Sequence, residues 1–411
     1  MVSQQTFVIV GASLAGAKAA ETLRDEGFGG RVVLVGEEPE RPYERPSLSK
    51  DLLVGDVATD KVYVHEPGWY DDHSIELWLG RRAIDLDPAA HQLRLNGGER
   101  LGYDRLLLAT GATPRALRVP GAELAGTHRL RTLGDAQELR AGLSGGGRRV
   151  VVVGGGWIGL EVAAAARSHG NDVTVVEPQP TPLRSALGDA MGTMFADLHR
   201  DHGVHLRLNT GVVEVTGAGD RVSGVVTSDG ARLPADLVVV GVGARPNVEL
   251  AEAAGLTVEN GVVVDQSLRT FDPDIFAAGD VANIYSTRRG QHVRVEHWDN
   301  ALHTGPAAAR SMLGQPVDYD RTPYFFTDQY DLGMEYTGFA DTERCDLVVR
   351  GDLDGRELVA FWVSGGVVRA GMNVNVWDVS ADIEALVRTP QPVDLDRLAD
   401  PDVPLSELLP R

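Results

Sequence analysis

Cysteine is almost missing from this sequence: Cys345 is the only one among 411 residues. A single cysteine excludes disulfide bonds within the chain and any Cys-x-x-Cys redox pair. We expect Cys345 to be an inert, buried thiol, since cysteine is among the residue types most often buried. The lack of a disulfide framework favours a cytoplasmic protein.

Long apolar runs are also absent, and none approaches the roughly 20 residues of a membrane-spanning helix. The N-terminal stretch MVSQQTFVIVGAS has no basic segment and leads straight into an expected strand, so we expect no signal peptide. Positive charge is in deficit: Lys and Arg number 39 against 59 Asp and Glu, a net charge of −20. This balance disfavours nucleic acid and anionic membranes as partners.

The sequence does contain an alternation of strand-like and helix-like segments. Apolar β-branched runs occupy residues 7–10, 150–153 and 237–240, and the first two are each followed by glycines and an Ala-rich helical segment. This order predicts the α/β class with parallel sheets, in a chain long enough for two or three domains. We interpret residues 140–149, with three consecutive glycines, as a linker into the second such unit.

Residues 319–411 follow a different pattern. Segments 335–339 and 357–363 favour antiparallel strands with glycine turns, and a helix is expected near 382–387. We interpret this part as a smaller α+β domain.

The second glycine-rich loop carries the strongest motif, Gly154-x-Gly156-x-x-Gly159, between a strand and a helix. In a dinucleotide-binding unit these glycines allow the tight turn, the approach of backbone to the pyrophosphate, and close helix packing. The phosphates then lie at the helix N-terminus, where free N–H groups favour anions. Glu177 ends the next strand, at the spacing of an acid that binds a ribose hydroxyl. The alternative is an ordinary Gly-rich strand–helix turn.

The first loop has a weaker form of the motif, in which Ser13 stands between Gly11 and Gly16. Serine is small and its hydroxyl can donate to a phosphate, but backbone approach is less free. Glu37 follows the second strand, in the place of the ribose-binding acid. Two dinucleotide motifs in one chain predict hydride transfer between two bound cofactors.

A third element, residues 275–281, reads as an apolar strand ending in Gly279 and Asp280, followed by a helix. Gly279 allows close backbone approach, and the Asp280 carboxylate suits the hydroxyls of a polyol such as the ribityl chain of FAD. The alternative is that Asp280 only caps the next helix.

With these motifs in place, the whole chain resembles the FAD-dependent, NADH-using ferredoxin reductases. Those enzymes serve Rieske dioxygenases and bacterial cytochromes P450 and are related to rubredoxin reductases. The resemblance is carried by GASLAG (11–16), PYERPSLSK (42–50), LLLATGATPR (106–115), HRLRTLGDA (128–136), GGGWIGLE (154–161), VGVGARPN (240–247), FAAGDVA (276–282), EHWDNA (296–301) and FFTDQYD (325–331).

The resemblance implies a glutathione-reductase-like fold with two dinucleotide-binding domains and a C-terminal α+β domain. Residues 1–108 and 240–318 would form a discontinuous FAD domain, residues 109–239 the NAD domain, and residues 319–411 a domain that shields the flavin. For FAD, the resemblance implies Gly11, Ser13, Ala15 and Gly16 at the pyrophosphate, Glu37 at the adenosine ribose, the backbone of Ala83 at the adenine, and Arg45 and Arg131 at phosphate or adenosine. It also implies Gly279 and Asp280 at the ribityl chain, and Trp298 at a helix start beside the flavin pyrimidine. For the nicotinamide nucleotide, it implies Gly154, Gly156, Gly159, Glu177 and Gly243.

Lys50 and Glu161 resemble the family's charged pair beside the flavin, with Glu161 expected in the first turn of the helix after Gly159. Lys50 would favour the electron-rich reduced flavin, and Glu161 would supply the partner that a buried lysine needs. The alternative is two separate surface charges. A carboxylate at position 177 favours NADH over NADPH, although Arg184 lies nearby in sequence.

The sequence departs from the family pattern at two positions, Ser13 and Phe326. Phe326 stands where a tryptophan is expected near the flavin, which puts in question any role of that indole in electron transfer.

The expected partner is a [2Fe–2S] ferredoxin or a rubredoxin, in a monomeric or homodimeric reductase, and no metal site is predicted. Docking would use a local basic patch of Arg288, Arg289 and Arg294; the alternative is a solvated loop. Two other functions use the same fold: an NADH oxidase or peroxidase, and an FAD/NADH-binding scaffold like the apoptosis-inducing relatives. The missing flavin-side cysteine disfavours the former, and the ordinary length disfavours the latter.

Overall fold

The computed structural model describes residues 5–409, which divide into two compact units. Unit 1 comprises the described residues up to Glu44 together with Thr59–Thr113 and Ala244–Arg321. Unit 2 comprises Arg45–Ala58, Pro114–Gly243 and the described residues from Thr322 onward. Residues 1–4, the start of the stretch in which no signal peptide was expected, lie outside the described part.

Unit 1 is built around a five-stranded parallel sheet of order β19-β7-β1-β2-β3. The central strand, TFVIV, is buried over four of its five residues, as is typical of a parallel strand covered on both faces. The elements of this unit are β1 (Thr6–Val10), α1 (Leu14–Asp25), β2 (Arg31–Val35), η2 (Thr59–Val62), α3 (Trp69–Asp72), β3 (Ile75–Trp78), β4 (Ala83–Asp87), β5 (Gln92–Leu95), β6 (Arg100–Gly102), β7 (Arg105–Leu108), β17 (Ala244–Pro246), α7 (Glu249–Ala253), β18 (Val262–Val264), β19 (Ile275–Ala277), η3 (Gly279–Val281), β20 (Ala282–Ser286), β21 (Gln291–Arg294) and α8 (Trp298–Met312), with β8 (Ala112–Pro114) where the chain passes into unit 2.

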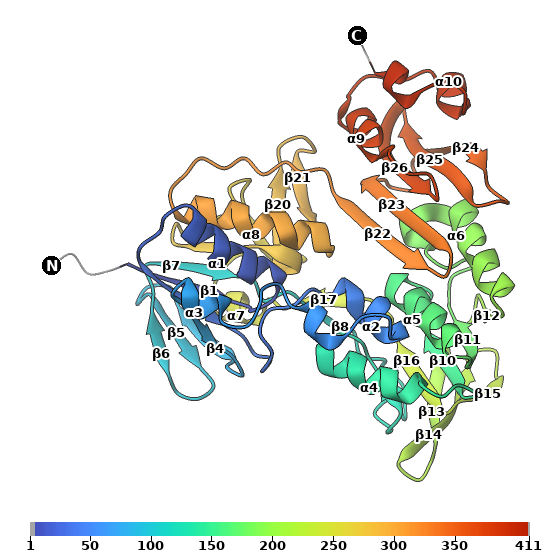
Figure 1. The fold of residues 1–411 in the computed structure, drawn as a ribbon, viewed down its shortest axis with the longest axis horizontal. Helices are drawn as coiled ribbons and strands as arrows, with labels where there is room; N and C mark the ends of the chain where they lie inside the picture. Colours follow the sequence, from blue (N-terminus) through green and yellow to red (C-terminus); the bar gives the residue numbers. More distant parts are fainter. Residues whose placement is uncertain (1–4, 410–411) are drawn as a thin grey trace. The chain divides into compact units, whose positions relative to one another are not determined.

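Helices α1 and α8 lie side by side in this unit (Figure 1). A Cβ atom at Gly305 of α8 would stand 2.3 Å from the carbonyl oxygen of Ala15 in α1, so only glycine permits this close approach. The contact brings the start of the α1 helix next to segments that are far along the chain.

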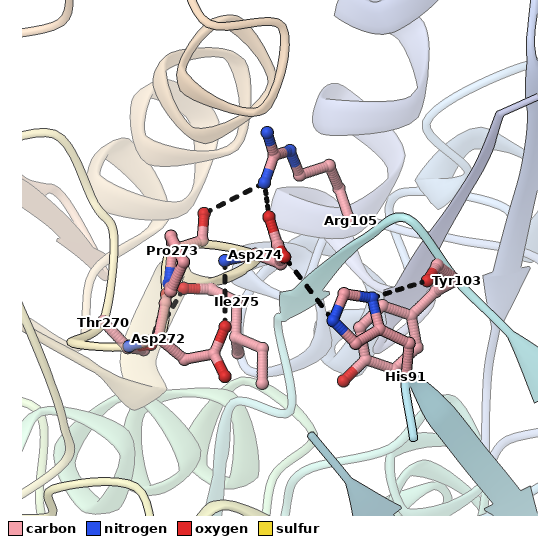
Figure 2. A network of polar contacts seen from close by, with 8 residues as sticks. All are labelled: His91, Tyr103, Arg105, Thr270, Asp272, Pro273, Asp274 and Ile275. Carbon is pink, nitrogen blue, oxygen red and sulfur yellow. Dashed lines mark hydrogen bonds and ion pairs between the residues drawn. The ribbon is translucent and has the colours of Figure 1, made fainter. Parts of the chain in front are cut away.

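A polar network fixes the outer strand β19 beside β7 (Figure 2). Arg105 of β7 forms an ion pair with Asp274 and donates a hydrogen bond to the carbonyl of Pro273. Asp274 also faces His91 at 3.5 Å, and the Thr270 hydroxyl donates to the Ile275 carbonyl. Because β19 leads directly into Gly279 and Asp280, this network positions that motif at the carboxyl end of the sheet.

Unit 2 repeats the parallel pattern in a sheet of order β12-β11-β10-β16-β9. The strand runs expected at residues 7–10, 150–153 and 237–240 are therefore all confirmed, as is the α/β class. The elements of unit 2 up to residue 243 are η1 (Pro46–Leu48), α2 (Asp51–Val54), β9 (Thr127–His128), α4 (Leu133–Leu143), β10 (Arg149–Val153), α5 (Trp157–Ser168), β11 (Asp172–Val176), α6 (Arg184–Asp201), β12 (His205–Arg207), β13 (Val212–Ala218), β14 (Arg221–Thr227), β15 (Arg232–Pro234) and β16 (Leu237–Val240).

The linker expected over 140–149 is shorter than predicted. Helix α4 continues to Leu143 because Leu139 and Leu143, one helical turn apart, are both fully buried, and β10 already begins at Arg149. A capping box of Thr132 and Asp135 fixes where this helix begins.

The C-terminal part of unit 2 contains an antiparallel sheet of order β22-β23-β26-β25-β24, as the sequence predicted. One face packs on α6 through a cluster that includes Phe195, Trp362 and Met372, and the other packs on the C-terminal helices. Its elements are β22 (Tyr324–Gln329), β23 (Leu332–Gly338), β24 (Asp346–Asp352), β25 (Glu357–Ser364), β26 (Val367–Val374), α9 (Ser380–Arg388), α10 (Leu395–Ala399) and η4 (Leu405–Leu408).

Across residues 5–409, no helix is long and apolar enough to cross a membrane.

Candidate functional site

The first glycine loop joins β1 to α1 at the point where the order of strands reverses. Gly11 has φ +123°, and a Cβ there would stand 2.0 Å from the carbonyl oxygen of Ala109. A Cβ at Gly16 would stand 2.0 Å from the carbonyl oxygen of Gly11. Both glycines are therefore required by the protein's own packing, at the crevice where α/β sheets bind nucleotides.

The second loop reproduces this geometry between β10 and α5. Gly154 has φ +107° with a Cβ position 2.4 Å from the Gly241 carbonyl, and the Cβ position of Gly159 lies 2.1 Å from the Gly154 carbonyl. The middle residue differs: a Cβ at Gly156 would meet its nearest neighbour at 4.0 Å. The protein itself leaves room for a side chain at this position of the motif, which explains how the first loop accommodates Ser13.

The N-termini of α1 and α5 are suited to binding an anion. Within residues 5–409, neither N-cap residue, Ser13 for α1 or Gly156 for α5, makes a side-chain capping hydrogen bond, and neither first turn contains an acidic residue. The first-turn N–H groups have no acceptor inside a helix. A pyrophosphate placed there would accept from them and face the positive end of the helix dipole. The loops therefore fit the dinucleotides that the motifs predict.

The two expected ribose-binding acids lie beside these loops. The Glu177 carboxylate accepts hydrogen bonds from the backbone N–H of Gly155 at 2.6 Å and of Gln179 at 2.8 Å, so it stands at the mouth of the second loop. In unit 1, Glu37 is exposed and pairs with Arg82 at 3.7 Å, next to Ala83 at the start of β4. The structure thus brings Glu37 close to the segment expected at the adenine.

The Gly279–Asp280 motif meets the first loop. Gly279 has φ +72°, its Cβ position lies 3.2 Å from the Ala15 methyl group, and its N–H donates to the Thr304 hydroxyl at 2.9 Å. The helix expected after it is wrong: one 3₁₀ turn, Gly279–Val281, leads into strand β20. Pairing of β20 with β18 overrides a helix here, so Asp280 does not cap a longer helix.

Trp298 is the first residue of α8, as expected. Its indole N–H donates to the Glu44 carboxylate at 3.0 Å. In unit 2, the guanidinium of Arg45 donates to the backbone carbonyl of Arg131, so the structure brings together two residues that were each expected at phosphate or adenosine. Gly243 has φ +94° and accepts a hydrogen bond from the N–H of Arg115.

Lys50 and Glu161 form a buried ion pair rather than two surface charges. Their side chains are 11% and 3% exposed, and Lys50 Nζ lies 2.7 Å from Glu161 Oε1. The Ser49 hydroxyl donates to Oε2 at 2.5 Å, and the Thr327 hydroxyl donates to Oε1 at 2.6 Å. A buried charge is stable only when it is paired and hydrogen-bonded, and Glu161 satisfies both conditions.

One detail of that prediction needs correction. Because Gly156 is the N-cap and α5 begins at Trp157, Glu161 is the fifth helical residue and lies in the second turn, not the first. Ser49 and Thr327 were not predicted as site residues. Ser49 ends the η1 turn next to Lys50, and Thr327 lies in strand β22. The available signal was that both lie inside the stretches PYERPSLSK and FFTDQYD, which carry the family resemblance.

Comparison with known proteins agrees with this geometry. Residues 5–305 match the model of the family described as "Pyridine nucleotide-disulphide oxidoreductase", and residues 324–409 match "Reductase C-terminal". The chain belongs to the pyridine nucleotide-disulphide oxidoreductase family. The fold with two dinucleotide-binding regions and a C-terminal domain is thereby confirmed.

Individual relatives of this oxidoreductase are similar over 95% or more of their length. Rhodocoxin reductase of Rhodococcus erythropolis is 39% identical over 409 residues, covering 99% of this chain and 95% of the relative. The ferredoxin–NAD(+) reductase component of the anthranilate 1,2-dioxygenase system of Burkholderia cepacia is 40% identical, covering 99% and 100%. A crystal structure of the covalent putidaredoxin reductase–putidaredoxin complex superposes with a TM-score of 0.94 at 36% identity, covering 98% of each chain. The resemblance to ferredoxin reductases is confirmed.

Phe326 and Cys345 bear on the chemistry of this oxidoreductase. The ring of Phe326, which replaces the expected tryptophan, has the Lys50 ammonium 5.4 Å from its centroid. Cys345 is half-buried beside the cluster of the C-terminal sheet rather than fully buried as expected, and its partial burial raises the pKa of its thiol. A raised pKa lowers the thiolate fraction and so agrees with an inert cysteine.

Three arginines singled out in the sequence, Arg184, Arg288 and Arg294, form ion pairs with acids. Arg184 pairs with Asp189 at 2.7 Å, which raises the pKa of the guanidinium, so its charge is already matched inside α6. In the β20–β21 hairpin, Arg288 faces Asp320 at 3.4 Å. Arg294 is 11% exposed, pairs with Glu296 and donates to the Asp280 carbonyl, because it lies in strand β21 rather than in the turn. The expected three-arginine patch is therefore reduced to Arg288 and Arg289.

Proposed function

We propose that this protein is an FAD-dependent NADH:ferredoxin reductase of a cytochrome P450 or Rieske oxygenase system. The observation that carries the proposal is the pair of glycine loops with dinucleotide-binding geometry. The buried Lys50–Glu161 pair supports it, as does the position of the one cysteine in the C-terminal region, away from both loops in sequence. Relatives named as ferredoxin–NAD(+) reductase components, which this chain matches over 98% or more of their length, support it.

The chain's own residues divide the binding work between the two loops. The loop of Gly11, Ser13, Ala15 and Gly16, with Glu37, Ala83, Gly279, Asp280 and Trp298, holds FAD, and Arg45 and Arg131 contribute to the same ligand. The loop of Gly154, Gly156 and Gly159, with Glu177 and Gly243, holds NADH. We accordingly assign residues 1–108 and 240–318 to FAD binding, 109–239 to NAD binding, and 319–411 to the C-terminal domain.

When bound, FAD supplies the exchange between the two-electron chemistry of NADH and the one-electron chemistry of an iron–sulfur protein. The protein's task is orientation and electrostatics. Lys50 presents a fixed positive charge in a site from which water is largely excluded, where charges act more strongly than in bulk solvent. Glu161 holds that charge in place. Glu177 accepts hydrogen bonds from ribose hydroxyls and repels the extra phosphate of NADPH.

The partner is a small iron–sulfur ferredoxin, with rubredoxin as the alternative acceptor. Because this chain carries a net charge of −20, docking of an acidic partner requires a local positive area, and Arg288 and Arg289 provide the candidate. The cytoplasmic location and the monomeric or homodimeric state stay predictions.

A single assay tests the proposed function against both alternatives. The purified yellow protein is mixed with NADH and cytochrome c, with and without a [2Fe–2S] ferredoxin. Fast cytochrome reduction that depends on ferredoxin is expected. Rapid oxygen consumption without ferredoxin would instead indicate an oxidase. Slow flavin reduction with a change in oligomeric state would indicate a scaffold.

A further inference from the structure

A row of polar side chains lies buried behind the Lys50–Glu161 pair. Thr327 and Gln329 on β22 and His199 on α6 are each at most 1% exposed. The Gln329 amide nitrogen lies 3.2 Å from the Thr327 hydroxyl, and His199 Nε2 lies 2.9 Å from the Gln329 amide oxygen. The Tyr330 hydroxyl lies 3.1 Å from His199 Nδ1. With the contact of Thr327 to Glu161, these groups form one continuous chain.

The direction of the chain follows from its first member. Glu161 receives the Lys50 ammonium, and an ionised carboxylate can only accept hydrogen bonds. The Thr327 hydroxyl must therefore donate its proton to Glu161, and its oxygen is left to accept from the Gln329 amide N–H.

This orientation determines the rest. Because the Gln329 nitrogen faces Thr327, the Gln329 oxygen faces His199 and must accept from Nε2–H. His199 is then the neutral tautomer protonated on Nε2, and its Nδ1 lone pair accepts from the Tyr330 hydroxyl. Every donor in the chain is directed toward Glu161.

We propose that Thr327, Gln329 and His199 are positioning residues for the Lys50–Glu161 pair. They hold the Glu161 carboxylate in one orientation as an ionised acceptor, and thereby hold the Lys50 ammonium at one point. These hydrogen bonds join three elements that are separate in sequence, α5, β22 and α6, so strand β22 of the C-terminal sheet contributes side chains to the site. The inference rests on the proposed function, in which Lys50 orients the bound cofactors.

Kinetic variants test the role of the first link. Thr327→Val keeps the shape and removes the hydroxyl, and Thr327→Ser restores a hydroxyl. Thr337→Val is the matched control: Thr337 is also buried and pairs with Tyr324, three residue pairs along the β22–β23 hairpin from the Thr327–Met334 pair. In stopped-flow reduction of the holoenzyme by NADH, Thr327→Val should lower the limiting rate of flavin bleaching about tenfold.

The dissociation constant for NADH should change little in Thr327→Val, since the carboxylate acts on the orientation of Lys50 and not on the nucleotide loop. Thr327→Ser should return the rate to near the wild-type value. If Thr327→Val behaves like Thr337→Val while the wild type reduces ferredoxin, the positioning role is wrong and the proposed function stands. If the wild type itself does not reduce ferredoxin, the proposed function fails first.

A spectroscopic measurement tests the direction of the chain without turnover, and it remains available if Thr327→Val does not fold. Wild-type protein with ¹⁵N-labelled histidine is compared with His199→Gln to assign the His199 resonances. At neutral pH the spectrum should show the neutral tautomer protonated on Nε2. A proton on Nδ1 alone, or an imidazolium at neutral pH, would overturn the inference.

Discussion

The Lys50 ammonium lies 2.7 Å from the Glu161 carboxylate, and both side chains are almost entirely removed from solvent. Replacing Lys50 by Gln leaves Glu161 buried with hydroxyl donors alone, so the variant should lose about 3 kcal/mol of stability. Its rate of flavin reduction by NADH should fall about tenfold or more, and the flavin potential should become more negative. Stopped-flow absorbance, redox titration and thermal unfolding measure the three effects.

Lys61→Gln is the control for that variant, because Lys61 is an exposed lysine of the short η2 segment. An unchanged rate and potential in Lys50→Gln would show that the buried pair is structural.

Nucleotide preference should respond to Glu177. Glu177→Ala removes the carboxylate that we propose binds the ribose and repels a 2′-phosphate, so the ratio of kcat/KM for NADH over NADPH should fall by about tenfold or more. Asp172→Asn, an exposed acid at the opposite end of the same strand, should keep the wild-type ratio. Equal ratios in Glu177→Ala and the wild type would show that this carboxylate does not discriminate between the riboses of NADH and NADPH.

The two motif positions of the first loop should differ sharply in tolerance. Gly11→Ala places a methyl group against the Ala109 carbonyl in a left-handed backbone conformation, and should abolish retention of FAD. Ser13→Gly should retain the flavin, since the equivalent residue of the second loop is Gly156. Flavin content per protein after gel filtration measures both, with Gly29→Ala, which meets open space, as the control. Full flavin content in Gly11→Ala would contradict the assigned loop geometry.

Acid should destabilise the protein partly through His199. Burial lowers its pKa to about 4 from the ordinary 6.5, so the folded state binds fewer protons than the unfolded state between these values. Its contribution to stability is complete above the unfolded pKa and is lost as the pH falls toward 4. From about pH 7.5 to about pH 4, this amounts to about 3 kcal/mol.

The comparison of wild type with His199→Gln isolates that contribution, because His297, whose pKa burial also lowers to about 4, is present in both. Urea unfolding at a series of pH values should show a shallower pH dependence for His199→Gln. Parallel curves would assign the acid sensitivity to other groups.

Docking should depend on the β20–β21 turn. Reversing charge in Arg288→Glu/Arg289→Glu should raise the KM for ferredoxin about tenfold at low ionic strength, and added salt should shrink the difference. Arg344→Glu, at a highly exposed arginine in the C-terminal region, is the matched reversal. The same KM for ferredoxin in both variants would show that the β20–β21 turn is not part of the docking surface.

The features that the sequence predicted correctly are those encoded locally. The glycine loops, the buried β-branched strands and the acids that follow them can be identified within about thirty residues of chain, the length of one βαβ unit. The family resemblance alone placed Ala15 and Gly279 at the same cofactor, and their contact depends on α1 and α8 packing together.

The errors and omissions come from tertiary structure. A helix after Asp280 was wrong because β20 pairs with β18, and Arg294 was wrongly counted as a surface charge because the β21 strand turns it inward. Thr327 contacts Glu161 across 166 positions of sequence, and His199 joins them from a third element. Local patterns specify which strands exist but not which polar side chains meet between them.

The starts of α1 and α5 make nucleotide concentration a determinant of how long this protein survives. In α4, Thr132 and Asp135 satisfy N–H groups at the start of the helix, whereas within the described residues α1 and α5 have no such side-chain cap. We propose that phosphate oxygens accept those hydrogen bonds at α1 and α5. A ligand that binds only the folded state stabilises it by mass action, by about 2.7 kcal/mol at a hundred times its dissociation constant. The melting temperature should therefore rise with the supply of FAD and NAD(H), so that the lifetime of the reductase against proteolysis follows the nucleotide pool that it draws on.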